Sequence, residues 1–253
     1  MTEQRTSGQQ QRTVVVSGGG TGIGRAIAVR FADDGDTVVI VGRRREVLEK
    51  AAAGRPNVVP FVADCTDPDQ LRALAAELEQ RGGVDVLVAN AGGSHHGPLE
   101  TLEQVAEHWR VTVDANLLSA VLLEAALRPL LRNGARFIAI SSASSRGGGE
   151  VAYATSKAAV NRWISQLASD LGGTATANVV SPGFVPDTEL YDGPVDEAVR
   201  VAAAQRTAVA RVGTPEDIAE VVHFVASPQA GFVSGTVVDV DGGRKVPVFR
   251  ARR

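Results

Sequence analysis

The sequence predicts an α/β fold, in which a doubly wound parallel β-sheet is flanked by helices on both faces. Short apolar runs rich in β-branched residues alternate along the chain with segments of helical periodicity, and this spacing is typical of repeated βαβ units. A glycine-rich loop lies between the first apolar run and the first helical segment. In a sheet of this kind, a ligand is expected beyond the carboxyl ends of the strands.

Length and composition favour one domain. The chain has 253 residues, of which 44% are hydrophobic and 22% are charged, so it can bury a large core. We expect residues 13–245 to form the domain, residues 1–12 to be a disordered tail and residues 246–253 to be a second tail. The net charge of −3 argues against nucleic-acid binding. No signal peptide or membrane span is evident, and the single cysteine, Cys65, fits a cytoplasmic location.

The first βαβ unit carries a dinucleotide signal. A β-branched run, Thr13 to Val16, leads into the glycine-rich segment Ser17 to Gly24, and Arg25 to Ala32 has helical periodicity. Glycines let the backbone approach a pyrophosphate, and the start of a helix offers free N–H groups to the anion. The alternative is a flexible surface turn, which this strand-and-helix context makes the weaker interpretation.

The end of the second predicted strand, Thr37 to Val41, bears on the choice of cofactor. The chain continues with Gly42 and three arginines, Arg43 to Arg45. An acidic residue here would bind the ribose hydroxyls of NAD, whereas an arginine accommodates the 2′-phosphate of NADP. We therefore expect Arg43, together with Arg44, to bind a phosphate. The alternative is that the arginines are a solvated helix start.

Two more strands are predicted over Asn57 to Val62 and Val84 to Ala89. The second is followed by Asn90-Ala91-Gly92-Gly93, a short turn that would let a cofactor lie close. His95 and His96 in the next loop could be metal ligands or acid–base groups. No cysteine or third histidine stands near them in the sequence, so we interpret them as solvated loop residues and expect no metal site.

The candidate catalytic pair is Tyr153 and Lys157. Residues four positions apart share one face of a helix, and a nearby ammonium lowers the pKa of a tyrosine, which can then exchange protons with an alcohol or carbonyl oxygen. A serine-rich segment, Ser141 to Ser145, follows a strand predicted over Ala135 to Ile140. Without those serines, a half-exposed tyrosine beside a solvated lysine would be the better interpretation.

A long helix is expected between Leu102 and Leu131, and Asn116 lies within its apolar stretch. A buried asparagine needs hydrogen-bond partners. Asn116 is therefore either a structural hydrogen-bonding residue or part of a polar relay.

In this order, the motifs resemble those of the short-chain dehydrogenase/reductase family, from Thr13 to about Gly243. The family's Thr-Gly-x-x-x-Gly-x-Gly matches Ser17 to Gly24, with serine in place of threonine, and its Asn-Asn-Ala-Gly matches Ala89 to Gly92, with its first asparagine replaced. The family's Pro-Gly motif matches Asn178 to Gly183.

The resemblance also covers the catalytic set, in which Ser142, Tyr153 and Lys157 match the family's serine, tyrosine and lysine. The segment between Ser142 and Tyr153 is about two residues shorter than in the usual family pattern. Ser141 is therefore an alternative to Ser142 as the catalytic serine. Asn116 matches the family's helix asparagine, and it would hold a water that relays protons to Lys157.

The resemblance implies a single-domain Rossmann-type enzyme that interconverts a carbonyl and a secondary alcohol by hydride transfer with NAD(P)(H). Tyr153 would be the general acid in reduction and the base in oxidation, Ser142 would hydrogen-bond the carbonyl oxygen, and Lys157 would bind the nicotinamide ribose. The implied cofactor-binding residues are Gly18, Gly20, Thr21, Gly22, Ile23, Gly24, Arg43, Arg44, Asp64, Cys65, Asn90, Ala91, Gly92, Tyr153, Lys157, Pro182, Gly183, Val185 and Thr188.

Arg43 favours NADP(H) over NAD(H). The alternatives are an NAD-dependent alcohol dehydrogenase and a non-catalytic dinucleotide-sensing protein of the same fold, which should have lost the tyrosine or the lysine. The partner is a small-molecule carbonyl or alcohol. The segment from Pro186 to Arg211 should cover the pocket, and it has no cluster of basic residues, which disfavours a strongly anionic substrate.

A homotetramer, or at least a dimer, is expected. The helices that contain Asn116 and Tyr153 carry more apolar residues than one domain face can obviously bury, and relatives pack these helices between subunits. The residues concerned are Leu117, Leu118, Val121, Leu122, Leu123, Val160, Trp163, Ile164 and Leu167.

Overall fold

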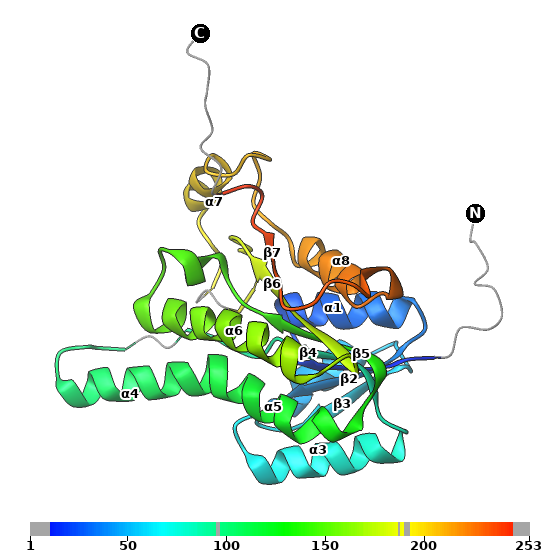
Figure 1. The fold of residues 1–253 in the computed structure, drawn as a ribbon. Coiled ribbons are helices and arrows are strands. Elements are labelled where there is room, and N and C mark those ends of the chain that lie inside the picture. The colour runs from blue at the N-terminus through cyan, green and yellow to red at the C-terminus, as the bar shows by residue number, and fades with distance from the viewer. Residues whose placement is uncertain (1–10, 95–96, 187, 190–192, 245–253) are drawn as a thin grey trace.

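The computed structural model describes residues 11–94, 97–186, 188–189 and 193–244. Within these residues the centre is a seven-stranded parallel sheet in the order β3-β2-β1-β4-β5-β6-β7 (Figure 1). The predicted doubly wound parallel sheet is confirmed. The strands are β1 (Thr13–Ser17), β2 (Thr37–Gly42), β3 (Val58–Val62), β4 (Val84–Ala89), β5 (Leu131–Ile140), β6 (Ala175–Pro182) and β7 (Val237–Val240).

Helices cover both faces of the sheet. α1 and α8 pack together on one face, whereas α3, α4, α5 and α6 lie on the other, and α7 stands apart, near the point where the chain leaves β7 (Figure 1). The helices are α1 (Gly22–Asp33), α2 (Arg45–Ala52), α3 (Pro68–Gln80), α4 (Leu102–Val113), α5 (Ser119–Leu127), α6 (Val151–Asp170), α7 (Glu197–Ala204) and α8 (Pro215–Val225). None of the helices in the described part of the chain is long and apolar enough to cross a membrane.

The sheet divides the core into two, because successive strand residues point to opposite faces. Val14 and Val16 of β1 pack with α1 and α8, while Val15 packs with α3, α5 and α6. All three valines are fully buried. Strands covered on both sides must be apolar at every position, which explains the continuous apolar runs in the sequence.

The order of the strands creates a crevice beside β1. After β1 the chain winds outward through β2 and β3, and it then returns to the other side of β1 to continue through β4. The loops that follow β1 and β4 therefore diverge, and the gap between them is the usual ligand position in this architecture.

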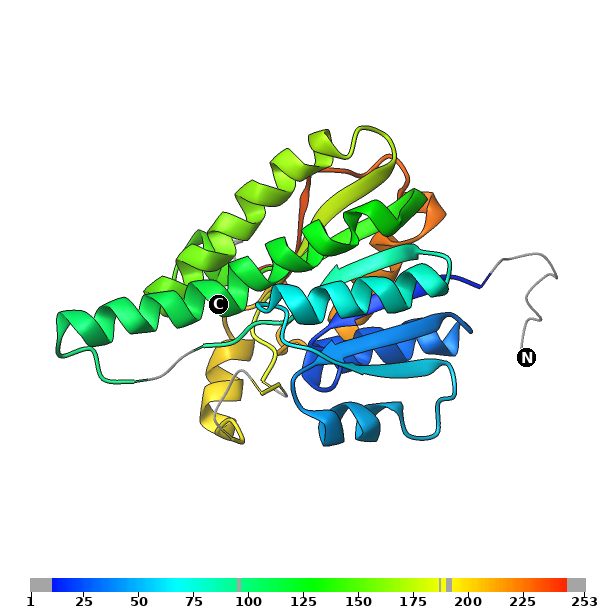
Figure 2. The same ribbon diagram turned by 90° about the horizontal axis from the view of Figure 1, so that it is seen from below.

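The long helix expected between Leu102 and Leu131 is interrupted. The five residues Asp114–Leu118 form a π-helix between α4 and α5, and β5 already begins at Leu131, although Figure 2 shows α4 and α5 running on as one rod. Asn116 is the buried residue of this segment, and its Nδ2 donates a hydrogen bond to the carbonyl oxygen of Thr112 at 2.9 Å. Such wide turns occur frequently at functional sites.

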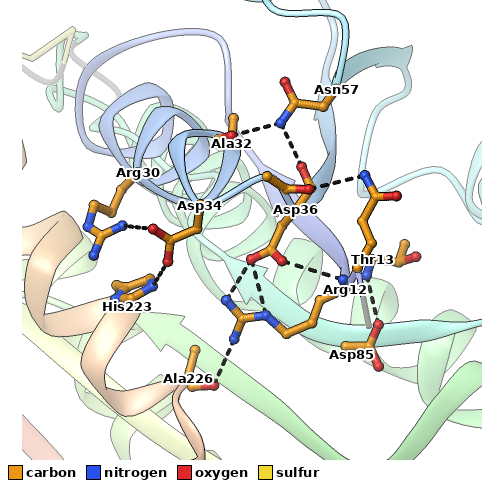
Figure 3. Close-up of polar contacts among 12 residues, drawn as sticks. Arg12, Thr13, Arg30, Ala32, Asp34, Asp36, Asn57, Asp85, His223 and Ala226 are labelled. Carbon is orange, nitrogen blue, oxygen red and sulfur yellow. Dashed lines mark hydrogen bonds and ion pairs between the residues drawn. The ribbon is translucent and has the colours of Figure 1, made fainter. Parts of the chain in front are cut away.

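At the amino ends of the strands, Arg12 ties the start of the domain together (Figure 3). Its guanidinium donates to the buried carboxylate of Asp36 at 2.6 and 3.1 Å, and also to the carbonyl oxygen of Ala226. Arg12 thus belongs to the folded unit, although we expected the tail to run through residue 12. Residues 1–10 and 245–253 lie outside the described residues.

Asp34 joins α1 to α8 at the same end of the molecule, where Arg30 and His223 donate to its carboxylate at 2.8 and 2.7 Å (Figure 3). Burial raises the pKa of Asp34, but the hydrogen bonds from Arg30 and His223 outweigh it, so the pKa lies below its ordinary value of 3.8. A lowered pKa contributes stability above the unfolded value, and this contribution disappears as the pH falls through the folded value.

We therefore expect Asp34→Asn to lower the free energy of unfolding at pH 7, by about 1 kcal/mol or less for a partly exposed group. The difference in unfolding free energy between variant and wild type, measured by urea unfolding at pH 7, 4 and 3, should become smaller as the pH falls. Glu79→Gln on the exposed face of α3 is the matched control. A difference that stayed constant over this pH range would contradict the assignment.

Candidate active site

A cleft of about 820 Å³ opens at the carboxyl ends of the central strands. Every residue that the sequence marked as catalytic or cofactor-binding lines it, from the glycine-rich loop to Thr188. It is also lined by residues that the sequence did not mark, among them Ser94, Asp114 and Glu189. The structure thus brings residues from eight separate segments to one surface.

The loops after β1 and β4 are joined by Ser17 and Asn90. The Ser17 hydroxyl accepts hydrogen bonds from the backbone N–H groups of Asn90 and Ala91, both at 3.0 Å. In return, Asn90 Nδ2 donates to the carbonyl oxygens of Ser17 at 3.0 Å and Gly18 at 3.3 Å. Serine therefore supplies the hydroxyl that threonine would provide at this position.

The start of α1 suits a phosphate group. Its N-cap residue, Thr21, makes no capping hydrogen bond with its side chain, whereas Asp67, Thr101 and Glu150 cap the starts of α3, α4 and α6. The first N–H groups of a helix have no partner within it. At α1 these donors and the positive end of the helix dipole face the cleft, which fits the pyrophosphate of a dinucleotide.

Arg43, Asp64 and Cys65 also line the cleft. The Asp64 carboxylate is held by the backbone N–H of Thr66 at 2.9 Å and by its hydroxyl at 2.7 Å. Burial and, to a smaller extent, the Asp64 charge raise the pKa of Cys65 to about 12, against the opposing effect of Arg43. Cys65 is therefore a protonated, buried wall residue. Arg43 is exposed, and no described residue forms an ion pair with it.

Sequence reasoning missed Glu189, which crosses the cleft. Its carboxylate accepts a hydrogen bond from Thr21 Oγ1 at 3.0 Å and pairs with Arg44 Nη2 at 2.5 Å. Thr188 lies against the glycine-rich loop, because a Cβ on Gly22 would be 3.3 Å from the Thr188 Cβ. No local motif marks Glu189, since its partners lie 168 and 145 residues away in the sequence.

Tyr153 and Lys157 lie on consecutive turns of α6, as expected. The Lys157 Nζ is 5.7 Å from the centroid of the Tyr153 ring, and it donates to the carbonyl oxygen of Ile140 at 2.9 Å. Ser141 and Ser142 have different hydrogen-bond partners. Ser141 is buried, with its hydroxyl donating to the carbonyl oxygen of Lys157 at 3.1 Å, whereas Ser142 hydrogen-bonds Tyr153.

The pKa shifts in this pair differ from our expectation. Burial raises the pKa of Tyr153, and the hydrogen bond from Ser142 opposes that rise. Lys157 is not among the causes of the Tyr153 pKa shift, and its ammonium donates to the carbonyl oxygen of Ile140. Burial instead lowers the pKa of Lys157 to about 8, since a buried ammonium loses its hydration.

Asn116 ties the loop after β4 to the π-helix. Its Nδ2 donates to the carbonyl oxygen of Gly93 at 2.7 Å, and its Oδ1 accepts from the Gly93 N–H at 3.1 Å. A Cβ on Gly92 would lie 2.6 Å from Asn116 Oδ1 and 3.2 Å from Lys157 Nζ. The loop can therefore pass this close to both side chains only because residue 92 is glycine.

The described part of the chain contains no group of three histidine, cysteine or acidic residues that could hold a metal ion. His95 and His96, which the sequence offered as metal ligands, acid–base groups or solvated loop residues, lie outside the described residues.

Known proteins resemble the chain over almost its whole length. A family model with the description "Enoyl-(Acyl carrier protein) reductase" matches residues 18–245. The chain is 38% identical to the 3-oxoacyl-[acyl-carrier-protein] reductase MabA of Mycobacterium bovis, with 96% of this chain and 98% of that protein covered. It is 33% identical to the 3-oxoacyl-[acyl-carrier-protein] reductase FabG of Thermotoga maritima, with 92% and 97% covered.

Solved structures share the fold. A short-chain dehydrogenase from Burkholderia cenocepacia, solved in complex with NADP, superimposes with a TM-score of 0.83 at 33% identity, over 93% of this chain and 98% of that one. Sequence motifs, cleft and relatives agree. The chain belongs to the short-chain dehydrogenase/reductase family and is an oxidoreductase that acts on CH–OH or C=O groups with a nicotinamide cofactor.

Proposed function

We propose that the protein is an NADPH-dependent reductase of 3-oxoacyl thioesters, with Tyr153 as the general acid. The observation that carries this proposal is that Ser142, Tyr153 and Lys157 line the same cleft as the glycine-rich loop and Arg43. The named activity of the two relatives supports the choice of a thioester-linked 3-oxoacyl group.

Tyr153, Ser142 and Asn116 have different roles in the reaction. The Tyr153 hydroxyl, kept protonated by its raised pKa, gives its proton to the carbonyl oxygen of the substrate. Ser142 donates a hydrogen bond to the same oxygen as negative charge develops there. The nicotinamide, when bound, supplies the hydride. Asn116 has both Nδ2 hydrogens engaged, and its Oδ1 already accepts from the Gly93 N–H, so one lone pair of Oδ1 remains for a water.

Binding of the cofactor falls to the residues already gathered in the cleft. The uncapped start of α1 and the loop Gly18 to Gly24 fit the pyrophosphate, and Asp64 stands at the adenine end. Lys157 is placed to hold the nicotinamide ribose. The pKa of Lys157 is about 8, so at neutral pH most of the side chain is in its ammonium form.

The proposal is tested by mixing the purified protein with NADPH and acetoacetyl-coenzyme A and following the absorbance of the reduced cofactor. We expect oxidation of NADPH that depends on the thioester. A dinucleotide-sensing protein would bind NADPH without turnover, so NADPH binding with no oxidation over a panel of 3-oxoacyl thioesters and activated ketones would favour that alternative. Retention of both Tyr153 and Lys157 argues against it.

Cofactor preference depends on Arg43. Arg44 is paired with Glu189, so Arg43 is the arginine whose guanidinium is open to a 2′-phosphate, and no carboxylate stands at the end of β2. A hydrogen bond to a charged group contributes about 1.5–3 kcal/mol, which corresponds to roughly 10- to 150-fold in affinity. We expect NADPH to exceed NADH by at least about tenfold in kcat/KM.

Arg43→Ala should weaken NADPH binding and barely change NADH binding. Measurement of Kd and kcat/KM for both cofactors tests this, with Arg45→Ala as the control because Arg45 is exposed and lies outside the cleft. Equal use of both cofactors by wild type would instead point to an NAD-dependent alcohol dehydrogenase. An equal loss for both in the variant would make Arg43 a solvated helix start.

A homotetramer or dimer is part of the proposal. Leu123, Val160, Ile164 and Leu167 are buried in the chain's own core, which removes four of the residues expected between subunits. Exposed apolar side chains remain on the same helices, including Leu102, Trp109 and Leu118 on the α4–α5 rod, and they favour a symmetric interface. Light scattering at micromolar concentration should give at least twice 26.4 kDa, and a single 26.4 kDa species would contradict it.

A further inference from the structure

A second cavity, of about 340 Å³, lies beside the catalytic cleft. Three segments that are distant in sequence line it: the loop after Ser142, the residues after α7 and the turn after β7. Each segment contributes one arginine, namely Arg146, Arg206 and Arg244, and we call this cavity the arginine pocket. It also contains one carboxylate, that of Asp241.

The arginine pocket shares walls with the catalytic cleft. Ala143 lines the pocket, while its neighbour Ser142 lines the cleft. On the other side, Asp241 lies directly behind Gly183 of the cleft, since a Cβ on Gly183 would be 2.7 Å from the Asp241 Cα. The pocket therefore begins one residue from Ser142 and lies behind the part of the cleft wall that Gly183 forms.

Backbone contacts fix the three arginines relative to one another. The chain after α7 is seated on the turn after β7, where the Ala208 N–H donates to the carbonyl oxygen of Gly242 at 2.8 Å. The Arg244 guanidinium lies over the glycine turn of the catalytic loop, because a Cβ on Gly148 would be 3.8 Å from its Nη2. The pocket is thus built from ordered contacts between the three segments.

Of the three guanidinium groups in the arginine pocket, those of Arg206 and Arg244 are available to a ligand. Arg146 forms an ion pair with Asp239, and the Asp241 carboxylate accepts from the Gly243 N–H at 3.0 Å. Among the described residues, neither Arg206 nor Arg244 has a side-chain hydrogen bond or an ion pair. The planar guanidinium groups of arginines bind carboxylate or phosphate oxygens through paired N–H donors.

We propose that the arginine pocket binds an anionic group of the substrate, a phosphate or a carboxylate, remote from the carbonyl that is reduced. This inference deepens the proposed function and rests on it. The sequence pointed the other way, because the segment from Pro186 to Arg211 has no cluster of basic residues. Only the fold brings Arg206 together with Arg146 and Arg244, which lie 60 and 38 residues away in the chain.

The test compares pairs of substrates that share a 3-oxoacyl group and differ in charge. Acetoacetyl-coenzyme A against the neutral N-acetylcysteamine thioester reports on phosphate, and the 1-ethyl half-ester of 3-oxoadipate against its diethyl ester reports on carboxylate. We expect the double variant Arg206→Gln/Arg244→Gln to reduce the ratio of kcat/KM for the charged over the neutral member at least about tenfold in one pair. The pair affected identifies the anion.

Arg72→Gln is the matched control, since it removes the same charge from the exposed surface of α3 and should leave both ratios unchanged. Unfolding temperatures of all variants show whether the fold is intact. Ratios in the double variant that equal those of wild type and of Arg72→Gln would overturn the inference.

A binding measurement separates failure of this inference from failure of the proposed function. With the protein saturated with NADP⁺, inorganic pyrophosphate and succinate are titrated while the unfolding temperature is followed. One of these anions should raise the Tm of wild type and not that of the double variant. If no 3-oxoacyl substrate is reduced, the proposed function fails, and equal Tm shifts in wild type and variant would still refute the anion pocket.

Discussion

Tyr153→Phe is expected to reduce kcat by about 10²- to 10⁴-fold, the usual contribution of a positioned general acid. Phenylalanine keeps the ring that packs in the cleft and removes the hydroxyl hydrogen-bonded to Ser142. The affinity for NADPH should stay within a fewfold of wild type, because the loss concerns an interaction made in the transition state.

Steady-state kinetics and NADPH titration of the same preparation measure the two quantities. Thr155→Val, an exposed position on the same helix, is the control for a general effect on α6. A Phe variant that turned over within a fewfold of wild type would exclude Tyr153 as the proton donor. Ser142→Ala should lower kcat as well, whereas Ser141→Ala should chiefly lower stability, since Ser141 bonds the Lys157 carbonyl.

Gly24→Ala is expected to destabilise the protein by more than the about 1–3 kcal/mol typical of an overpacked core position. A Cβ at this position would lie 2.2 Å from the carbonyl oxygen of Gly18 and 2.5 Å from Asn90 Nδ2. The glycine-rich loop would have to move away from α1, and NADPH affinity should fall with it because the start of α1 then loses its place under the pyrophosphate.

Urea unfolding without cofactor and NADPH titration test this expectation. Gly93→Ala is the control for stability, because a Cβ there would meet nothing within 4 Å. Wild-type stability and affinity in Gly24→Ala would mean that the loop tolerates a different packing. A loss of affinity with full stability would show that the glycine serves the ligand alone.

The fold and the membership of the site could be predicted because they rest on short-range patterns. Val14 to Val16 are apolar at every position since the sheet buries both faces of β1, and periodicity shows this directly. The glycine-rich loop and the pair Tyr153 and Lys157 each lie within one segment. Their spacing can therefore be seen directly in the sequence. The alternation of strands and helices then places both motifs at the same end of the sheet.

The remaining features depend on contacts between distant segments. Glu189 reaches Thr21 and Arg44 across the cleft, and nothing beside Glu189 in the chain signals it. Ser141 and Ser142 are chemically identical, and only the direction in which each points at the end of β5 separates a helix anchor from a neighbour of Tyr153. The direction expected for the Tyr153 pKa was wrong because burial, which a sequence does not show, raises it, and the expected effect of Lys157 is absent.

The π-helix at Asp114–Leu118 has a consequence for how the surrounding segment tolerates change. A π-turn closes its hydrogen bond one residue farther along the chain than an α-turn, so this segment uses one residue more than a regular helix for about the same rotation. Deletion of one of these five residues would therefore let α4 and α5 run on as a regular helix with little change in the phase of α5. Leu123 and Leu127, both fully buried, would stay in the core, whereas a deletion in the regular part of α4 would rotate everything after it by about 100°. Single-residue gaps should thus damage the fold less at the π-helix than beside it, and their cost should fall on Asn116 and its hydrogen bonds to Gly93.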